Sequence, residues 1–243
     1  MWEFIDKAVY INLDHREDRR KIMNQFFQEA GVPSEKIERF SAIKHAVGIV
    51  GCAMGHIEIL KKAKREGWKA VLILEDDMEW VPDSYARLEK LVTETPNWDV
   101  CMLTGLYMES APPKVQIAFC TNAYIVNQHY YDTLLNNFET GLKHKLNIRQ
   151  PGILSIIRDT RTEKIKNYEI DRRNQYNIDV YWFKLQMRDN WIAMFPPCCN
   201  QLETYSDIYN SVKKHNPPES GKQDLYTYMV LPVKQGLKDG TIL

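Results

Sequence analysis

The sequence predicts an α/β fold with a mostly parallel central sheet. Three short apolar segments, residues 8–13, 69–74 and 98–103, have the composition of buried strands. Residues 16–30 and 51–66, which lie between the first two strands, show apolar side chains at helical spacing. Strands that alternate with helices are typical of a parallel sheet covered by helices. Ligands of such sheets bind at the carboxyl ends of the strands, so the residues after each strand are the first candidates for a site.

The ends of the helices are marked by residues that favour helix termination. Gly31 and Pro33 end the helix expected from about residue 16, and Gly67 ends the helix expected from residue 51. In the second half of the chain, residues 118–126 are expected to form one or two strands. Residues 128–137 are expected to form a helix.

Residues 143–173 differ from the rest of the chain in charge. They hold nine Lys/Arg and four Asp/Glu, a local net charge of +5. The segment is predicted to be either a solvated basic loop or a lid that faces an anion. From residue 210 the chain is polar, and residues 210–243 are expected to form a partly disordered tail. Residues 1–243 are interpreted as a single domain.

The composition excludes several classes of protein. Because 32 Lys+Arg balance 32 Asp+Glu, we expect no overall attraction to nucleic acid or to an anionic membrane. No segment approaches the roughly 18 uninterrupted apolar residues of a membrane span, and the first seven residues lack the pattern of a signal peptide. Five cysteines without a CxxC pair are interpreted as reduced thiols, which favours a cytoplasmic location.

Three consecutive acids follow the apolar segment 69–74. Glu75, Asp76 and Asp77 are costly at the end of a buried strand unless a cation compensates their charge. Alternation along a strand would place Glu75 and Asp77 on one face and Asp76 on the other. Oxygen ligands suit Mn²⁺ or Mg²⁺ with a bound diphosphate. The alternative is a solvated acidic turn that caps the next helix.

Two further segments qualify as ligand sites. At the end of the first strand, Asn12 and Leu13 precede a helix whose first turn carries Arg16 and Arg20, groups that suit a nucleotide. Asp14 with Glu17, three residues later, also reads as a capping box. Neither the dinucleotide fingerprint nor the Walker loop occurs in the chain.

The other segment is residues 48–56, in which small residues ahead of the expected helix would permit close approach of a ligand. His56 would then either reach that ligand or serve as a hydrogen-bonded structural residue.

Taken in order, these motifs resemble glycosyltransferase family 25, which includes lipo-oligosaccharide and collagen galactosyltransferases. The likeness runs from about residue 8 to residue 208. It rests on segments 11–20, 48–56, 72–77, 98–105 and 123–126, on Asp179, on Pro197 with Gln201, and on residues 206–208. Gly55 stands where the family usually has Ser, so any contact that the Ser hydroxyl makes in the family is not expected in this chain.

The resemblance implies a GT-A (Rossmann-like) nucleotide-sugar transferase fold. It implies an inverting, metal-dependent transfer of a hexose, galactose or glucose, from a UDP-sugar to a hydroxyl of a glycan, lipo-oligosaccharide or protein. The cofactor would be Mn²⁺ or Mg²⁺, held by Glu75 and Asp77 with Asp207 as a further ligand. The donor would contact a larger set: Asn12, Leu13, Arg16, Arg20, His56 and Asp76.

Inversion also needs a carboxylate that takes the proton of the acceptor hydroxyl. Asp179, at the start of the apolar run 179–185, is the candidate for this general base, with Asp207 as the second choice. The alternative role of Asp179 is an N-cap of the helix that this run would form.

Two other functions stay open at this point. A nucleotidyltransferase that makes nucleotide sugars would need a glycine-rich loop after the first strand, which is absent. An inactive sugar- or nucleotide-binding relative would be expected to have lost acids that this chain keeps, Glu75, Asp76, Asp77 and Asp179. Cytoplasmic sugar donors favour a bacterial protein or a viral protein in a host cytoplasm.

Overall fold

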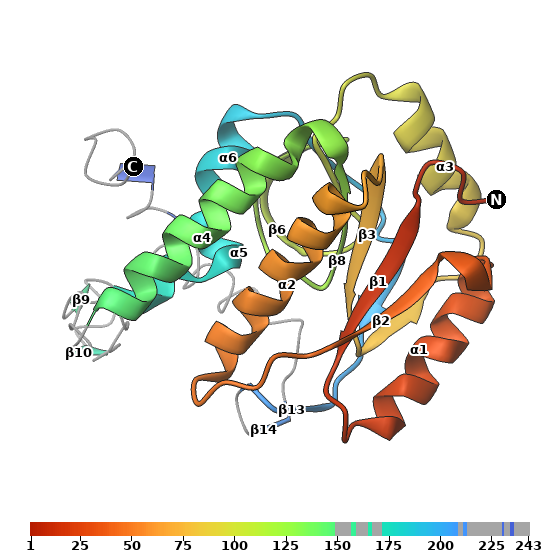
Figure 1. Cartoon of the computed structure of the whole chain (residues 1–243). Coiled ribbons are helices and arrows are strands. Elements are labelled where there is room, and N and C mark those ends of the chain that lie inside the picture. The colour runs from red at the N-terminus through yellow and green to blue at the C-terminus, as the bar shows by residue number, and fades with distance from the viewer. Residues whose placement is uncertain are drawn as a thin grey trace.

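A computed structural model describes residues 1–148 and 172–208, together with the short pieces 157–158, 165–166, 211–212, 230 and 234–235. Figure 1 shows a central sheet with helices on both of its faces. The sheet has eight strands in the order β2-β1-β3-β8-β5-β11-β7-β6. These strands are β1 (Lys7–Asn12), β2 (Ile37–Ser41), β3 (Ala70–Glu75), β5 (Val100–Met102), β6 (Leu106–Ala111), β7 (Lys114–Phe119), β8 (Ala123–Asn127) and β11 (Trp191–Ala193).

The expected α/β class is confirmed, but the sheet is more mixed than predicted. Strand β1 pairs in parallel with β2 and β3, and β5 pairs in parallel with β11. Strand β8 lies between β3 and β5 and runs antiparallel to both. Strand β7 is antiparallel to β11 and β6. The apolar pattern of residues 118–126 indicated strands but carries no information about their direction, because both kinds of buried strand have the same composition.

The remaining elements flank this sheet. The helices are α1 (Glu17–Ala30), α2 (Gly48–Arg65), α3 (Tyr85–Glu94), α4 (Tyr131–Asn147), α5 (Ile178–Tyr181) and α6 (Phe183–Arg188), with short 3₁₀ turns η1 (Ser34–Lys36), η2 (Gln128–Tyr130) and η3 (Arg172–Tyr176). Three small antiparallel ladders pair β4 (Met78–Trp80) with β12 (Cys199–Gln201), β9 (Ile157–Arg158) with β10 (Ile165–Lys166), and β13 (Tyr205–Ser206) with β14 (Ser211–Val212). Within the described residues, no helix is long and apolar enough to cross a membrane.

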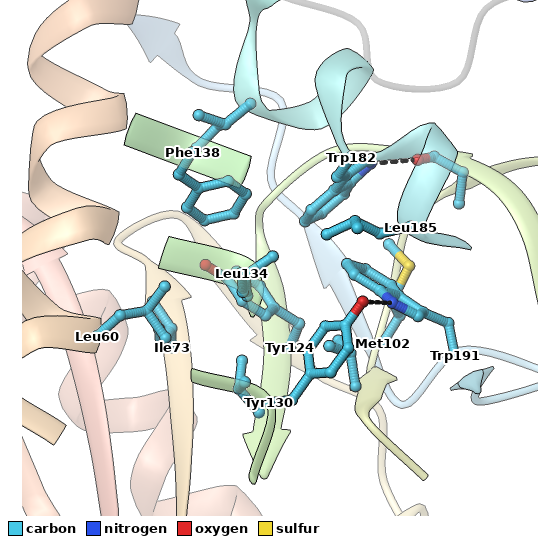
Figure 2. Packing of buried hydrophobic residues seen from close by; sticks show 14 of the residues in the cluster. Leu60, Ile73, Met102, Tyr124, Tyr130, Leu134, Phe138, Trp182, Leu185 and Trp191 are labelled. Atoms are coloured by element: carbon cyan, nitrogen blue, oxygen red, sulfur yellow. Dashed lines mark hydrogen bonds between the residues drawn. The ribbon is translucent and has the colours of Figure 1, made fainter. Parts of the chain in front are cut away.

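The sheet separates two hydrophobic cores. Along β3, Val71 and Ile73 face the core made with α2, α4, α5 and α6, whereas Leu72 and Leu74 face the core made with α1 and α3. Figure 2 shows the first core, where aromatic rings from several elements meet and the Trp191 indole donates to the Tyr130 hydroxyl at 3.2 Å. Alternation along β3 therefore also decides which face each acid at its end will occupy.

Helix α2 begins three residues earlier than predicted. Gly48 consequently lies inside the helix, as Gly51 and Gly55 do, which corrects the expectation of small residues in a segment ahead of it. Glycine is needed at residue 51 for packing, because a Cβ there would lie 2.3 Å from the carbonyl oxygen of Ile43. A Cβ on Gly48 would lie 3.0 Å from the Cα of Ile208.

The segment predicted to be a basic loop or lid, residues 143–173, begins inside helix α4, which continues to Asn147. Its residues 172 and 173 belong to η3. Residues 149–171, apart from the short β9 and β10, lie outside the described residues. Most of the expected tail, residues 210–243, lies outside them as well. The loop or lid and the tail therefore remain predictions.

Candidate active site at the carboxyl ends of β1 and β3

The carboxyl ends of β1 and β3 bring Asn12 and Asp76 together. These strands are parallel neighbours, so the residues that follow or end them meet at one edge of the sheet. The Asn12 amide donates to Oδ2 of Asp76 at 2.7 Å, and neither residue is more than 6% exposed. The amide oxygen of Asn12 accepts from Nη1 of Arg39 at 3.2 Å.

Arg19 is a buried side chain of this site that the sequence analysis did not single out. Its guanidinium donates to Oδ1 of Asp76 and lies 3.4 Å from Oδ2 of Asp77. Arg19 is only 7% exposed. The helical pattern contained a signal for this burial: Arg19 lies four residues before Met23, and therefore on the apolar face of α1 that packs on the sheet.

The same guanidinium also binds a segment from the far end of the chain. Its Nη2 donates to the Thr204 hydroxyl at 2.9 Å and to the carbonyl oxygen of Tyr205 at 2.7 Å. Nearby, the backbone N–H of Leu202 donates to the carbonyl oxygen of Asp77 at 2.8 Å. Residues 201–208, which we call the strap, thus cover the carboxyl ends of β1 and β3. Figure 1 shows β13, which is part of the strap, close to the start of α1.

Arg16 and Asp207, both predicted as site residues, bind each other in this structure. Nη1 of Arg16 donates to Oδ2 of Asp207, and Nε2 of His15 lies 3.8 Å from Oδ1. Arg16 also donates to Asp18, and hydrogen bonds to these two carboxylates raise its pKa further above the usual value. Asp207 is therefore placed at the turn after β1, on the side of the arginines.

The predicted capping box at the start of α1 is wrong. Arg16 occupies the N-cap position, without a side-chain capping bond. The Asp14 carboxylate instead accepts hydrogen bonds from Arg39 at 2.8 Å and Ser41 at 2.7 Å. Those bonds hold the Asp14 pKa below its usual value. The Arg20 side chain donates to the Asp14 carbonyl oxygen and stays in the same turn.

Leu13, a predicted donor contact, is half-buried in this turn. Its carbonyl oxygen accepts from the backbone N–H of Arg16 at 2.9 Å. The turn after β1 is thus held closed by its own backbone as well as by the side chains of Arg20 and Arg39.

Glu75 faces the opposite side of the sheet from Asp76, as strand alternation requires. Its Oε1 accepts from the Thr121 hydroxyl at 2.8 Å. Burial is the main reason that the Glu75 pKa rises to about 8, and the negative charge of Asp77 adds to the rise. Burial and the neighbouring charge of Asp77 thus favour the protonated form of Glu75.

Asp77 contacts Gln201 and Arg19 at this edge of the sheet. Both of its carboxylate oxygens lie 3.3 Å from Nε2 of Gln201, in addition to the 3.4 Å contact with Arg19. The carboxylate oxygens of all three acids are of the kind that a hard divalent cation binds, and both oxygens of Asp76 are held by Asn12 and Arg19.

Asp179 enters the site from the opposite half of the chain. It lies in the first turn of α5, where Asn177 holds the N-cap position, so the alternative role of Asp179 as the cap is wrong. Oδ2 of Asp179 accepts from the backbone N–H of Cys120 at 3.3 Å. Burial raises the Asp179 pKa, and the charge of Asp179 contributes to the raised pKa of Glu75. The two carboxylates therefore belong to one electrostatic cluster.

The His56 side chain lies in the core, where Tyr124 holds it. It is 0% exposed, its Nδ1 is 2.8 Å from the Tyr124 hydroxyl, and its ring stacks on that of Tyr124. Burial lowers the His56 pKa to about 3, so the ring is neutral. Helix α2 carries His56 into the core beneath Glu75, as the alternative of a hydrogen-bonded structural residue requires, and the donor contact stays a prediction.

No family model matches the chain. A protein of Acanthamoeba polyphaga mimivirus with the name "Putative glycosyltransferase R655" is 31% identical over 121 residues, which cover 41% of this chain and 37% of that protein. The chain thus aligns with little more than a third of the length of this relative.

Two solved structures are similar to the chain. A197 from STIV has a TM-score of 0.44 and 10% identity, over 87% of this chain and 95% of that chain. A glycosyltransferase involved in the glycosylation of the major capsid of PBCV-1 has a TM-score of 0.47 and 7% identity, over 90% of this chain and 97% of that chain. Both TM-scores lie below 0.5, so neither likeness carries weight for the function.

Proposed function

We propose that this protein is a glycosyltransferase that moves a hexose from a UDP-sugar to a hydroxyl group, in a GT-A type of fold. The observation that carries the proposal is the site itself: carboxylates at the end of β3 lie beside an arginine-rich turn after β1. Such a site presents cationic groups to a diphosphate and carboxylates to a metal ion and an acceptor. The partial likeness to the mimivirus protein supports the same class of activity.

The donor would lie over the turn after β1. Arg16 and Arg20 would bind the phosphates there, next to Asn12 and Leu13, since guanidinium groups match phosphate oxygens in pairs. Asp76 would act indirectly, because Asn12 and Arg19 already occupy its carboxylate. The strap would be displaced from Arg16 as the donor enters, since Asp207 now occupies that guanidinium.

The metal ion of this proposal would be held by Asp77 and Glu75, with Asp207 as a further ligand if the strap rearranges. Mn²⁺ or Mg²⁺ bound there would neutralise the departing diphosphate as a Lewis acid. The raised pKa of Glu75 supports the assignment, because a divalent cation would stabilise the charged form that burial and the charge of Asp77 disfavour.

The transfer would be a single displacement with inversion. The acceptor oxygen forms a bond to the anomeric carbon while the bond from that carbon to the diphosphate oxygen breaks, and the diphosphate leaves with the electron pair. Asp179 takes the proton of the acceptor hydroxyl. Its raised pKa is favourable for this role, because a base works best when its pKa approaches the working pH. The acceptor would be a glycan, lipo-oligosaccharide or protein in the cytoplasm, where UDP-sugars are made.

The test is an assay of UDP release with Mn²⁺ across UDP-galactose, UDP-glucose and other donors. Activity is expected with at least one donor and is expected to disappear in excess EDTA. Asp77→Ala should lose most turnover while the fold survives. The matched control is Asp132→Ala, which removes a 73% exposed carboxylate on α4 and should keep wild-type turnover.

Other outcomes would point to the other functions. Pyrophosphate release from a nucleoside triphosphate and a sugar phosphate would identify a nucleotidyltransferase. UDP binding without release from any donor would identify an inactive relative. Full activity in excess EDTA would remove the metal from the proposal.

A further inference from the structure

Three side chains with different ligand atoms converge beneath the acidic edge of the sheet. Cys52 and His56 are four residues apart on α2, a spacing that places them on one face of a helix. Glu75 ends the adjacent strand β3. One ligand atom from each of the three lies within 4.8 Å of the others. Among the described residues, this is the group of His, Cys, Asp and Glu side chains whose ligand atoms lie close enough together to hold a metal ion.

One nitrogen of the His56 ring lacks a hydrogen-bond partner at this place. Nδ1 is held by the Tyr124 hydroxyl at 2.8 Å, but Nε2 is buried and has no hydrogen-bond partner among the described residues. A buried polar atom left without a partner costs about 1–3 kcal/mol. Such an atom in a native protein points to a bound water or ion. A metal-bound histidine donates its other ring N–H to an acceptor that fixes the ring, and the oxygen of the Tyr124 hydroxyl is placed to accept from Nδ1.

We propose that Cys52, His56 and Glu75 form a binding site for a zinc-class divalent metal ion. A sulfur, a nitrogen and an oxygen ligand together favour Zn²⁺ over Mg²⁺ or Mn²⁺, which prefer oxygen ligands alone. The three protein ligands leave a fourth tetrahedral position for water. Binding converts the Cys52 thiol to a thiolate and releases its proton to solvent.

This site goes beyond the proposed transferase, with which it shares Glu75. The metal of the transferase would be centred on Asp77, whereas Cys52 and His56 come from α2 on the other side of Glu75. Glu75 is common to both sets, so the experiment must separate them through the residues that are not shared.

The experiment is a titration of the chelator-treated protein with Co²⁺, followed by Zn²⁺. Co²⁺ is expected to give the near-ultraviolet charge-transfer band of a cobalt–thiolate bond and the visible bands of tetrahedral cobalt, both of which Zn²⁺ then removes. Cys52→Ser should abolish the thiolate band and weaken Co²⁺ binding by at least about tenfold. His56→Gln should weaken it similarly.

Two control variants locate the site. Cys198→Ala removes a buried thiol from the other core and should leave the band unchanged. Asp77→Asn should also leave the band unchanged, although the proposed function expects it to lose transferase activity. A failed transferase assay therefore does not affect this result. Circular dichroism of each variant checks that it is folded.

A second measurement needs only the wild-type protein. Zn²⁺ should slow alkylation of the half-buried Cys52 thiol, measured by mass spectrometry, more than that of Cys120. Co²⁺ that binds without a thiolate band, a band that survives Cys52→Ser in a folded variant, or no Co²⁺ binding at all would overturn the proposal and leave a water molecule on His56.

Discussion

Arg19 is a buried positive charge whose partners are themselves buried. It faces Asp76 and Asp77, and neither carboxylate is more than 6% exposed. Loss of one member of such a group leaves the others desolvated without compensation, which costs about 3–5 kcal/mol. Arg19→Gln should therefore lower the free energy of unfolding by about that amount, measured by urea denaturation.

The control for Arg19 is Arg65→Gln at the end of α2. The Arg65 side chain is 67% exposed, so its replacement should change stability by less than about 0.5 kcal/mol. If the two variants were equally stable, the pairs that Arg19 makes would contribute nothing to the fold.

The role of Asp179 as general base can be tested by a substitution that replaces one atom of its carboxylate. Asp179→Asn keeps the size of the side chain and its acceptor for the Cys120 N–H, but it removes the proton acceptor. Turnover should fall by at least about a hundredfold, whereas UDP binding stays near wild type. The melting temperature should shift by no more than a few degrees, about what 1 kcal/mol produces. A variant with wild-type turnover would transfer the role to Asp207.

At the scale of elements, the glycines of α2 differ in whether the surrounding structure requires a glycine. A Cβ on Gly51 would lie 2.3 Å from the Ile43 carbonyl oxygen, whereas on Gly55 its nearest neighbour, Cδ1 of Ile11, is at 3.6 Å. Gly51→Ala should therefore destabilise the protein by about 1–3 kcal/mol. Gly55→Ala should stabilise it by about 0.5–1 kcal/mol, since glycine is a poor residue inside a helix.

Thermal melts of the two glycine variants, made in the same background, provide the comparison. Equal melting temperatures would mean that the loop at Ile43 moves aside without cost. The ordinary contacts at residue 55 indicate that the Cβ of the Ser that the family usually has would fit there.

The strongest elements were predictable from local pattern, and the weaker ones were not. Strands β1, β3 and β5 are continuous apolar runs, and α1 ends at Gly31 in the left-handed conformation, so pattern and cap agree there. Strand β2 was missed because every residue in it is half-buried or exposed at the sheet edge, which removes the apolar run. The small ladder of β4 with β12 depends on pairing between distant residues, which no local pattern encodes.

The site shows the same division. The acids at the end of β3 and the residues after β1 were placed at one edge of the sheet by topology alone. The pairing of individual acids with individual arginines was not predictable, because the strap, which begins at residue 201, contacts Arg16 and Arg19 from far along the chain. The burial of His56 was left open because the sequence placed it in a helix without showing which of its polar side chains faces the sheet.

For the molecule as a whole, His56 links stability to pH. Its pKa falls from 6.5 to about 3 on folding because the ring is buried beside Cys52, Glu75 and Tyr124. The unfolded chain therefore binds one more proton between these pH values. Stability from this group is complete above pH 6.5 and is lost as the pH falls, by about 1.4 kcal/mol per pH unit.

The measurement is urea unfolding in chelator at several pH values. Between pH 6.5 and 5 the wild type should lose about 2 kcal/mol more than His56→Gln does. His45→Gln replaces an exposed ring that contacts only nearby backbone, and it should keep the wild-type slope. Parallel curves for wild type and His56→Gln would contradict the buried neutral ring.

The distance along the chain between Arg19 and its partners matters while the protein is being synthesised. Arg19 meets Asp76 after 57 residues, but the Tyr205 carbonyl only after 186. The amino-terminal part of the chain is synthesised first. Strand β5 therefore has an unpaired edge until β11 has been synthesised. An unpaired edge strand can form hydrogen bonds with another chain. The nascent chain is thus most in need of chaperones, which would cover this edge, until residue 191 has been synthesised. Arg19 and its acidic partners are covered only after the strap has been synthesised.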